Sequence, residues 1–326
     1  MLKAFLKPKA DRIRSYVSSR VDQRTYDSLL LQGRQASWHV RAKKNISSLA
    51  DVEFKVFSQW GEDGIIDWII ERANLPHYLQ TFIEFGVESY DESNTRFLLE
   101  NRLWKGFVID ADPELHKNLS RNPHYWRYNL KDKSAFINCE NINDLIVGAG
   151  FSGDIGLLSI DIDGNDYWVW DAISVVNPVI CVCEYNSHFG NLHSVSIPYD
   201  PEFAWGKKHK LLYYGASIQA LSSLARRKGY KFLGTTTAGN NAFFIREDYS
   251  SWVAGGLDRA ISYPSCLSPS IVVGPAPAIE LCDAYKEIQD LPIVQTDDGQ
   301  VVSLRSLGRI HDEIWLQRMS KKAIAL

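Results

Sequence analysis

The sequence lacks any run of about 18 or more apolar residues, so no segment is expected to span a membrane. Its first residues, MLKAFLKPKADRIR, carry charges too early and too often for the apolar core of a signal peptide. Cysteine is scarce: there are five (Cys139, Cys181, Cys183, Cys266 and Cys282), and no second Cys/His pair completes a metal site with the C-x-C at 181–183. We therefore expect buried free thiols and a cytoplasmic protein.

The sequence also lacks a glycine-rich phosphate loop. A dinucleotide-binding fold places G-x-G-x-x-G directly after its first strand, so that the backbone can approach a pyrophosphate. The corresponding segment here, residues 86–93, reads GVESYDES and has one glycine with acidic residues where a phosphate would lie. This turn disfavours phosphate and suits a cationic ligand better.

Positive charge is concentrated at one end of the chain. Residues 1–44 carry 11 Lys/Arg and three Asp/Glu, a net charge of +8, whereas the whole chain has −3 and the remainder therefore −11. A basic arm on an acidic body could contact an anionic membrane surface or another polyanion. The interpretation we favour is a solvated helical extension or an arm for homo-oligomerisation. Because the remainder is acidic, a nucleic-acid partner is not expected.

Apolar patterning divides the chain into three parts. Residues 1–56 are expected to form a basic helical extension broken around Pro8 and Gly33, and residues 250–326 a C-terminal annex with a hairpin near 297–299 and a basic terminal helix. Between them, residues 57–249 alternate short apolar runs with amphipathic segments. Predicted strands cover 81–85, 106–110, 135–139, 157–160 and 179–183, followed by an antiparallel pair at 230–236 and 241–246. This alternation predicts a doubly wound, Rossmann-like α/β sheet.

Three helices in this middle part have recognisable ends. Ser58 is expected to cap a helix over 58–73, and Asn94 a helix over 94–105 that Gly106 closes. Asp166 is expected as the cap or first-turn acid of a third. The long loop at 187–213, rich in His, Pro and aromatic residues, has the length of a lid or substrate wall.

The carboxyl ends of the predicted strands carry most of the acidic candidates. Glu84 and Gly86 end the first strand and Asp110 the second, while Asp161 and Asp163 follow the fourth and Glu184 and Asn186 the fifth. Ligands of open α/β sheets bind at this edge. S-adenosylmethionine carries a sulfonium and an ammonium beside an adenosine, without phosphate. Glu84 and Gly86 would line its amino-acid part, and Asp110 would accept from both ribose hydroxyls.

Nine sequence segments together resemble the FkbM-type S-adenosylmethionine-dependent methyltransferases. These are FSQWGEDGI (57–65), TFIEFG (81–86) with SNT (93–95), GFVIDADP (106–113), CENIN (139–143), SIDIDGNDYWVW (159–170), CEYN (183–186) and YGASIQALSSLARRKGYKFLG (214–234) with GNNAFFIR (239–246). The resemblance implies the class I methyltransferase fold, a seven-stranded sheet whose last strand is antiparallel. It also implies that Gln59, Glu62 and Asp63 approach the cofactor, with Asn94 and Thr95 beside it. Val87 and Glu88 stand where many methyltransferases have a second glycine.

The acidic strand ends could also hold a metal. Asp161, Asp163, Glu184 and Asn186 are all oxygen ligands of the kind that Mg²⁺ uses. The arrangement is similar to that of the cation-dependent catechol and caffeoyl-CoA methyltransferases, although Glu184 would have to replace their Asp, one residue out of step. Without a metal, Asp161 or Asp163 would bind the ammonium or act as the base. His188 is a further candidate base, with His193 and His209 behind it.

The function expected from these residues is O-methylation of a sugar hydroxyl in a glycan or glycosylated metabolite. The expected cofactor is S-adenosylmethionine, and Mg²⁺ is a candidate second cofactor. Two alternatives stay open. Asp161-Ile162-Asp163 is a D-x-D, the motif with which a metal-dependent glycosyltransferase holds a nucleotide-sugar diphosphate. The chain could also be a methyltransferase-like scaffold without turnover.

Overall fold

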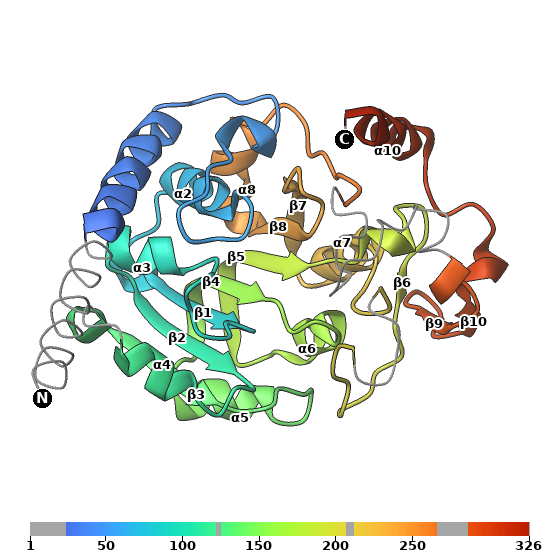
Figure 1. Cartoon of the computed structure of the whole chain (residues 1–326), viewed down its shortest axis with the longest axis horizontal. Coiled ribbons are helices and arrows are strands. Elements are labelled where there is room, and N and C mark those ends of the chain that lie inside the picture. The colour runs from blue at the N-terminus through green and yellow to red at the C-terminus, as the bar shows by residue number, and fades with distance from the viewer. Residues whose placement is uncertain (1–23, 122–124, 207–211, 266–285, 326) are drawn as a thin grey trace, which may run out of the picture.

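A computed structural model describes residues 24–121, 125–206, 212–265 and 286–325, with side chains as far as 319. A seven-stranded sheet lies at its centre (Figure 1). Its strands are β1 (Thr81–Phe85), β2 (Lys105–Asp110), β3 (Leu130–Ser134), β4 (Gly153–Ile160), β5 (Val176–Glu184), β7 (Tyr230–Thr235) and β8 (Asn241–Arg246). The order is β3-β2-β1-β4-β5-β8-β7. Strand β8 runs antiparallel to both of its neighbours, so the predicted Rossmann-like fold with its last strand reversed is confirmed.

Helices cover both faces of this sheet. They are α2 (Glu62–Ala73), α3 (Arg96–Arg102), α4 (Leu115–Arg121), α5 (Ile142–Gly148), α6 (Asp166–Ala172), α7 (Ile218–Arg227), α8 (Glu247–Ala254) and α10 (Glu313–Ala325), with 3-10 turns η1 (Leu49–Val52), η2 (His77–Leu79), η3 (Tyr125–Arg127), η4 (Ser187–Phe189) and η5 (Leu304–Leu307). One apolar core joins the sheet to α2, α3, α4 and α8, and a second joins it to α5, α6 and α7. Strand residues alternate between these cores, as period two requires.

A second sheet links the C-terminal annex to the loop after β5. Strands β9 (Pro292–Gln295) and β10 (Val301–Ser303) form the predicted hairpin, and β9 also pairs with β6 (Val195–Ser196). Their side chains share a third apolar core with Phe189 and Leu212. The annex therefore fixes the long loop, which places the loop as a wall beside the central sheet. No helix within the described ranges combines the length and the apolar content needed to cross a bilayer.

The predicted third strand was wrong. The strand is Leu130–Ser134, not 135–139. It lies at the edge of the sheet, where only alternate side chains are half-buried, so its polar sequence LKDKS gave no apolar signal. The apolar residues that follow it, including Phe136, which is 44% exposed, instead line a cavity.

Several helix ends also differ from the prediction. Helix α2 begins at Glu62 after Gly61, because Ser58 uses its hydroxyl and N–H to bind Asp63. Helix α3 begins after Thr95 and ends at Arg102, with Leu103 in the left-handed conformation that was expected of a glycine. Residues 24–41 form one helix through Gly33, whose missing Cβ admits Val56 at close range. The predicted break at Pro8 lies outside the described residues.

Candidate functional site

The candidate site is a cavity of about 630 Å³ at the carboxyl ends of the central strands. It lies at the point where the strand order reverses between β1 and β4, as expected for a ligand site in a doubly wound sheet. Seven carboxylates line it: Glu84, Glu88, Glu92, Asp110, Asp161, Asp163 and Glu184. Among its described lining residues there is no Lys or Arg. The cavity thus favours cationic ligands and ligands that donate hydrogen bonds.

Three polar residues lie in a row on one face of the sheet. The register pairs Ile160 of β4 with Cys183 of β5, so Asp161 lies beside Glu184 one residue further on. Glu184 pairs in turn with Asn241 of β8. Neighbouring side chains on one face of paired strands have Cβ atoms about 5 Å apart. The strand ends therefore bring together residues that are 80 positions apart in the sequence.

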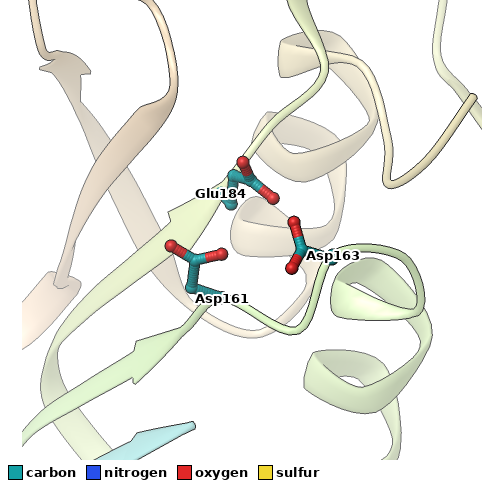
Figure 2. Close-up of side chains that lie close together, drawn as sticks. All are labelled: Asp161, Asp163 and Glu184. Carbon is teal, nitrogen blue, oxygen red and sulfur yellow. The ribbon is translucent and has the colours of Figure 1, made fainter. Parts of the chain in front are cut away.

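Asp161, Asp163 and Glu184 all line this cavity, and their side chains lie close together (Figure 2). One carboxylate oxygen of each lies within 4.8 Å of the other two. Asp163 reaches inward because its backbone has a positive φ of 55°, uncommon for a residue with a side chain. Asp166 supports this turn by accepting hydrogen bonds from the N–H groups of Ile162 and Gly164 at 2.8 and 2.9 Å. Its predicted role in the first turn of α6 is confirmed.

The three carboxyl groups repel one another. Burial and then the charge of Asp163 raise the pKa of Asp161 well above its ordinary value, and burial and the charge of Asp161 do the same for Glu184. The pKa of Asp163 is raised too, by loss of solvent and by Asp166. In addition, the buried Oε2 of Glu184 has no hydrogen-bond partner within the described structure. A site with crowded carboxylates and a buried acceptor oxygen is incomplete without a positive charge.

Gly86 allows β1 to pass very close to the turn after β4. A Cβ at this position would lie 1.5 Å from the carbonyl oxygen of Asp161, and its φ is +73°. No other residue type fits there. Glu88 lies where many methyltransferases have a second glycine. It has a positive φ of 46° and donates its N–H to Asp110 Oδ2 at 2.7 Å.

Asp110 lies at the end of β2 and lines the cavity, as predicted. Its two oxygens accept one backbone hydrogen bond each, from Glu88 and from Asp112, both at 2.7 Å. A carboxylate has about four acceptor sites, so two remain for a ligand. Beside it, Ala111, Phe136 and Ile137 give the same end of the cavity an apolar wall.

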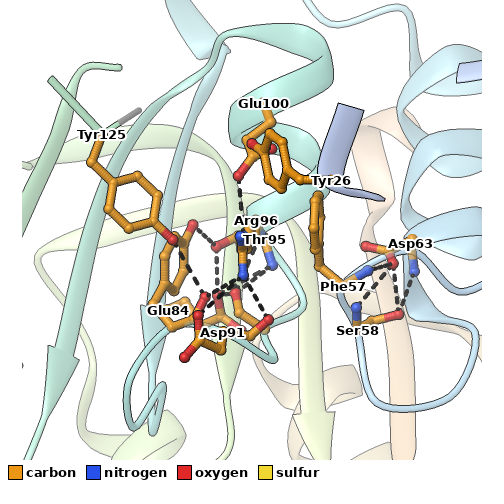
Figure 3. A network of polar contacts seen from close by, with 12 residues as sticks. Tyr26, Phe57, Ser58, Asp63, Glu84, Asp91, Thr95, Arg96, Glu100 and Tyr125 are labelled. Carbon is orange, nitrogen blue, oxygen red and sulfur yellow. Dashed lines mark hydrogen bonds and ion pairs between the residues drawn. The ribbon is translucent and has the colours of Figure 1, made fainter. Parts of the chain in front are cut away.

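Glu84 is the centre of a polar network that orders the loop between β1 and α3 (Figure 3). It accepts hydrogen bonds from the Ser93 hydroxyl at 2.6 Å, from the N–H of Asn94 at 2.8 Å, and from both the N–H and the hydroxyl of Thr95. Burial raises the pKa of Glu84 and these donors lower it in part. Although Glu84 lines the cavity, its carboxylate is largely used within the loop.

The other predicted cofactor-binding residues divide into two groups. Gln59 and Asn94 line the cavity. Thr95 is fully buried behind it and supports Glu84, so its side chain faces the loop and not a ligand. Glu62 and Asp63 are buried structural residues: Asp63 accepts from the N–H groups of residues 56–58, and Glu62 bonds to Asn241.

Asn186 does not point its amide at the carboxylate cluster. Its Oδ1 accepts from the N–H of His188 at 2.9 Å, and its Nδ2 donates to the carbonyls of Leu212 and Tyr214 at 2.8 and 2.9 Å. It therefore holds the wall of the cavity together. His188 does line the cavity, and burial with repulsion from His311 lowers its pKa to about 4. His193 bonds to the carbonyl of Arg309, and His209 lies outside the described residues.

Two cavity residues that could bind a ligand, Asn241 and Asn165, were not identified from the sequence. Asn241 and Asn165 are 1% and 3% exposed, and the Oδ1 of each has no partner within the described structure. The signal for Asn241 was its place at the start of β8, opposite Glu184, which appears only once the strand register is known. Cys181 and Cys183 are buried free thiols as predicted, whereas Cys266 and Cys282 lie outside the described residues.

Comparisons with known proteins give distant structural similarities. No family model matches the chain, and no curated protein matches it. A S-adenosylmethionine-dependent methyltransferase from Clostridium acetobutylicum ATCC 824 is similar at 10% identity and a TM-score of 0.35, over 57% of this chain and 90% of that one. The CurJ carbon methyltransferase is similar at 11% identity and a TM-score of 0.37, over 68% of this chain and 70% of that one. The citrinin polyketide synthase CMeT domain is similar at 13% identity and a TM-score of 0.35, over 57% of this chain and 54% of that one.

Proposed function

We propose that this protein is a S-adenosylmethionine-dependent methyltransferase of the FkbM type that methylates a hydroxyl group, most simply on a sugar. The observation that carries the proposal is the continuous acidic cavity at the strand ends, which has two chemically different halves. Around Asp110 it offers acceptor oxygens beside an apolar wall. Around Glu184 it offers carboxylates beside aromatic side chains.

The first half fits the cofactor. Asp110 would accept from the ribose hydroxyls, and Ala111, Phe136 and Ile137 would contact the adenine. The methionine part would lie beside Gly86, with Asn94 and Gln59 at its rim. S-adenosylmethionine supplies a methyl group activated by its sulfonium for in-line displacement, and orientation of the two reactants contributes much of the rate.

The second half fits an acceptor with hydroxyl groups. Phe203, Trp205 and Tyr214 form part of its wall and offer flat faces for a sugar ring. Asp161, Asp163 and Glu184 fit a divalent cation such as Mg²⁺, because their oxygens converge and the Glu184 Oε2 has no partner within the described residues. When bound, such a cation would lower the pKa of a neighbouring hydroxyl. The pKa of about 4 keeps the His188 imidazole neutral at pH 7 but makes it a weak proton acceptor, so as the base it would need an acceptor hydroxyl acidified by the cation.

Isothermal titration with S-adenosylhomocysteine tests the proposal. We expect the protein to bind it and Asp110→Asn to bind it at least tenfold more weakly, since one of the two acceptor oxygens becomes an NH₂ donor and the negative charge is lost. Titration with UDP in the presence of Mg²⁺ is the control. Binding of UDP without any response to S-adenosylhomocysteine would replace the proposal by the glycosyltransferase, in which Asp161 and Asp163 hold a diphosphate.

An acceptor screen then separates an enzyme from a scaffold. Tight binding of S-adenosylhomocysteine without methyl transfer to any polyol, glycan or glycosylated metabolite would favour the scaffold. The radioactive methyl group of labelled S-adenosylmethionine is the readout, because it marks the product of transfer whichever acceptor and position receive it.

A further inference from the structure

The buried amide of Asn241 is unusual in having one group bound and the other free. Its Nδ2 donates to Glu62 Oε1 at 2.9 Å, which fixes which end of the amide is the oxygen. The Oδ1 is buried, belongs to a residue that lines the cavity, and has no hydrogen-bond partner within the described structure. A buried acceptor without a partner is costly unless a ligand satisfies it.

Glu62 holds this amide in one orientation. Its Oε2 accepts from the N–H groups of Trp60 and Gly61, both at 2.9 Å, at the beginning of α2. Its Oε1 is thereby left facing Asn241. Because Glu62 offers only acceptors in this position, Asn241 has to turn its NH₂ toward α2 and its oxygen away from it.

The free oxygen lies next to the carboxylate cluster. Asn241 is the direct partner of Glu184 in the register of β5 and β8, and both residues extend to the face of the sheet that α2 covers, as Val182 and Phe243 do. The Oε2 of Glu184 also lacks a partner within the described residues. Two adjacent buried acceptors without a donor between them are the arrangement that a cation satisfies.

We propose that Asn241 supplies the neutral amide oxygen of the cation site formed by Asp161, Asp163 and Glu184, and that Glu62 orients it. This inference rests on the cation in the proposed function. It assigns to Asn241 the ligand role that the sequence suggested for Asn186, whose amide holds the wall. A neutral fourth ligand adds coordination without adding a fourth negative charge.

Titration with Mn²⁺, which prefers the same oxygen ligands as Mg²⁺, tests the assignment by calorimetry and by the electron paramagnetic resonance signal of the free ion. We expect the wild-type protein to bind one Mn²⁺ and Asn241→Ala to bind it at least tenfold more weakly. Asn240→Ala is the matched control: its amide lies on the same turn but is bound to Thr236 and Gln59, so its affinity should stay within twofold of wild type.

Glu62→Gln tests the orientation while leaving Asn241 in place. In this variant the amide oxygen at 62 keeps the two backbone N–H groups, so its NH₂ faces Asn241. The amide of Asn241 then turns over and presents NH₂ to the cation. We expect a loss of Mn²⁺ affinity similar to that of Asn241→Ala, about 10- to 100-fold, and no further loss in the double variant.

The outcomes separate the two proposals. Wild-type affinity for Mn²⁺ in both Asn241→Ala and Glu62→Gln would overturn the role of Asn241 and leave the cation site standing. Absence of Mn²⁺ binding in a wild-type protein that binds S-adenosylhomocysteine would overturn the cation and the role of Asn241 but leave the methyltransferase. Thermal unfolding of each variant shows whether a lost affinity reflects a lost fold.

Discussion

Two groups of acidic side chains lie at the carboxyl ends of the central strands, one around the buried Glu84 on β1 and the other around the partly buried Glu184 on β5. The carboxylate of Glu84 has four donors, all from residues 93–95 of its own loop. The Glu184 group has crowded carboxylates and a buried oxygen without a partner in the described part of the chain. The donors around Glu84 offset part of the cost of burying its carboxylate, whereas the Glu184 group has no such donors in the described structure and is left for a ligand.

The Glu84 network extends outward to the N-terminal helix. Arg96, the first residue of α3, bonds to Glu100 at 3.1 Å, and its guanidinium lies 4.1 Å from the ring centre of Phe57. Glu100 in turn accepts from the hydroxyl of Tyr26 on the helix 24–41 (Figure 3). The loop that borders the cavity beside Gly86 is thereby tied to elements outside the sheet.

The largest expected effect is on the stability of the Glu84 group. Glu84→Ala removes the acceptor of four buried hydrogen bonds, although the Thr95 N–H also donates to Ser93 Oγ at 3.1 Å and the Thr95 hydroxyl also bonds to Tyr90. We expect a loss of about 3–5 kcal/mol in the free energy of unfolding. Ser93→Ala removes one donor to Glu84 and one acceptor of the N–H groups of Thr95 and Arg96, and should cost less, about 1–2 kcal/mol. Urea denaturation of wild type and both variants measures the two losses in the free energy of unfolding. A Glu84→Ala variant as stable as Ser93→Ala would mean that the network does not hold the loop.

The second prediction has the opposite sign. The raised pKa of Glu184 means that its ionised form lowers stability, an effect absent below the ordinary pKa of Glu, near pH 4, and growing as the pH rises through the raised pKa. In EDTA, Glu184→Gln should therefore be more stable than wild type by about 1 kcal/mol at pH 8, and no more stable at pH 4.

Denaturation with urea at the two pH values gives the difference directly, and Mn²⁺ should reverse it by stabilising wild type alone. A Glu184→Gln variant that is less stable than wild type at pH 8 without metal would remove the contrast between the two groups.

The sequence was sufficient for the order of the elements but not for the assignment of single polar groups. Apolar runs and helical patterns placed β1, β2, β4, β5, β7 and β8, because each of these strands contains several buried apolar residues. They failed at β3, an edge strand with the polar sequence LKDKS and no fully buried residue. The acidic ends of strands at Asp110, Asp161 and Glu184 were found because the topology of a parallel sheet brings them to one edge.

Asn186 and Asn241 show why the partners of single polar side chains could not be predicted from the sequence. Both are asparagines beside strand ends, and in the sequence Asn186 is the one near Glu184. In the fold Asn241 is the cross-strand neighbour of Glu184, and Asn186 donates to the carbonyls of Leu212 and Tyr214, some 26 residues further along the chain. The partner of a side chain depends on strand register and on loop path, and neither is contained in local sequence.

The smallest expected effect concerns His188. This residue lines the cavity like the acidic side chains but carries no charge at neutral pH. Burial and His311 lower its pKa to about 4, below the 6.5 or so expected in the unfolded chain. Between these values the unfolded state binds more protons, so the contribution of His188 to stability is present above pH 6.5 and declines as the pH falls toward 4.

His188→Gln removes this dependence of stability on pH. We expect it to gain about 0.7 kcal/mol relative to wild type on going from pH 7 to pH 6, as measured by urea denaturation at both values, with the exposed His39→Gln as the control for the loss of one titratable group. An unchanged difference across this range would mean that His188 keeps an ordinary pKa in the cavity, which would make it a stronger base at neutral pH than an imidazole with a pKa of about 4.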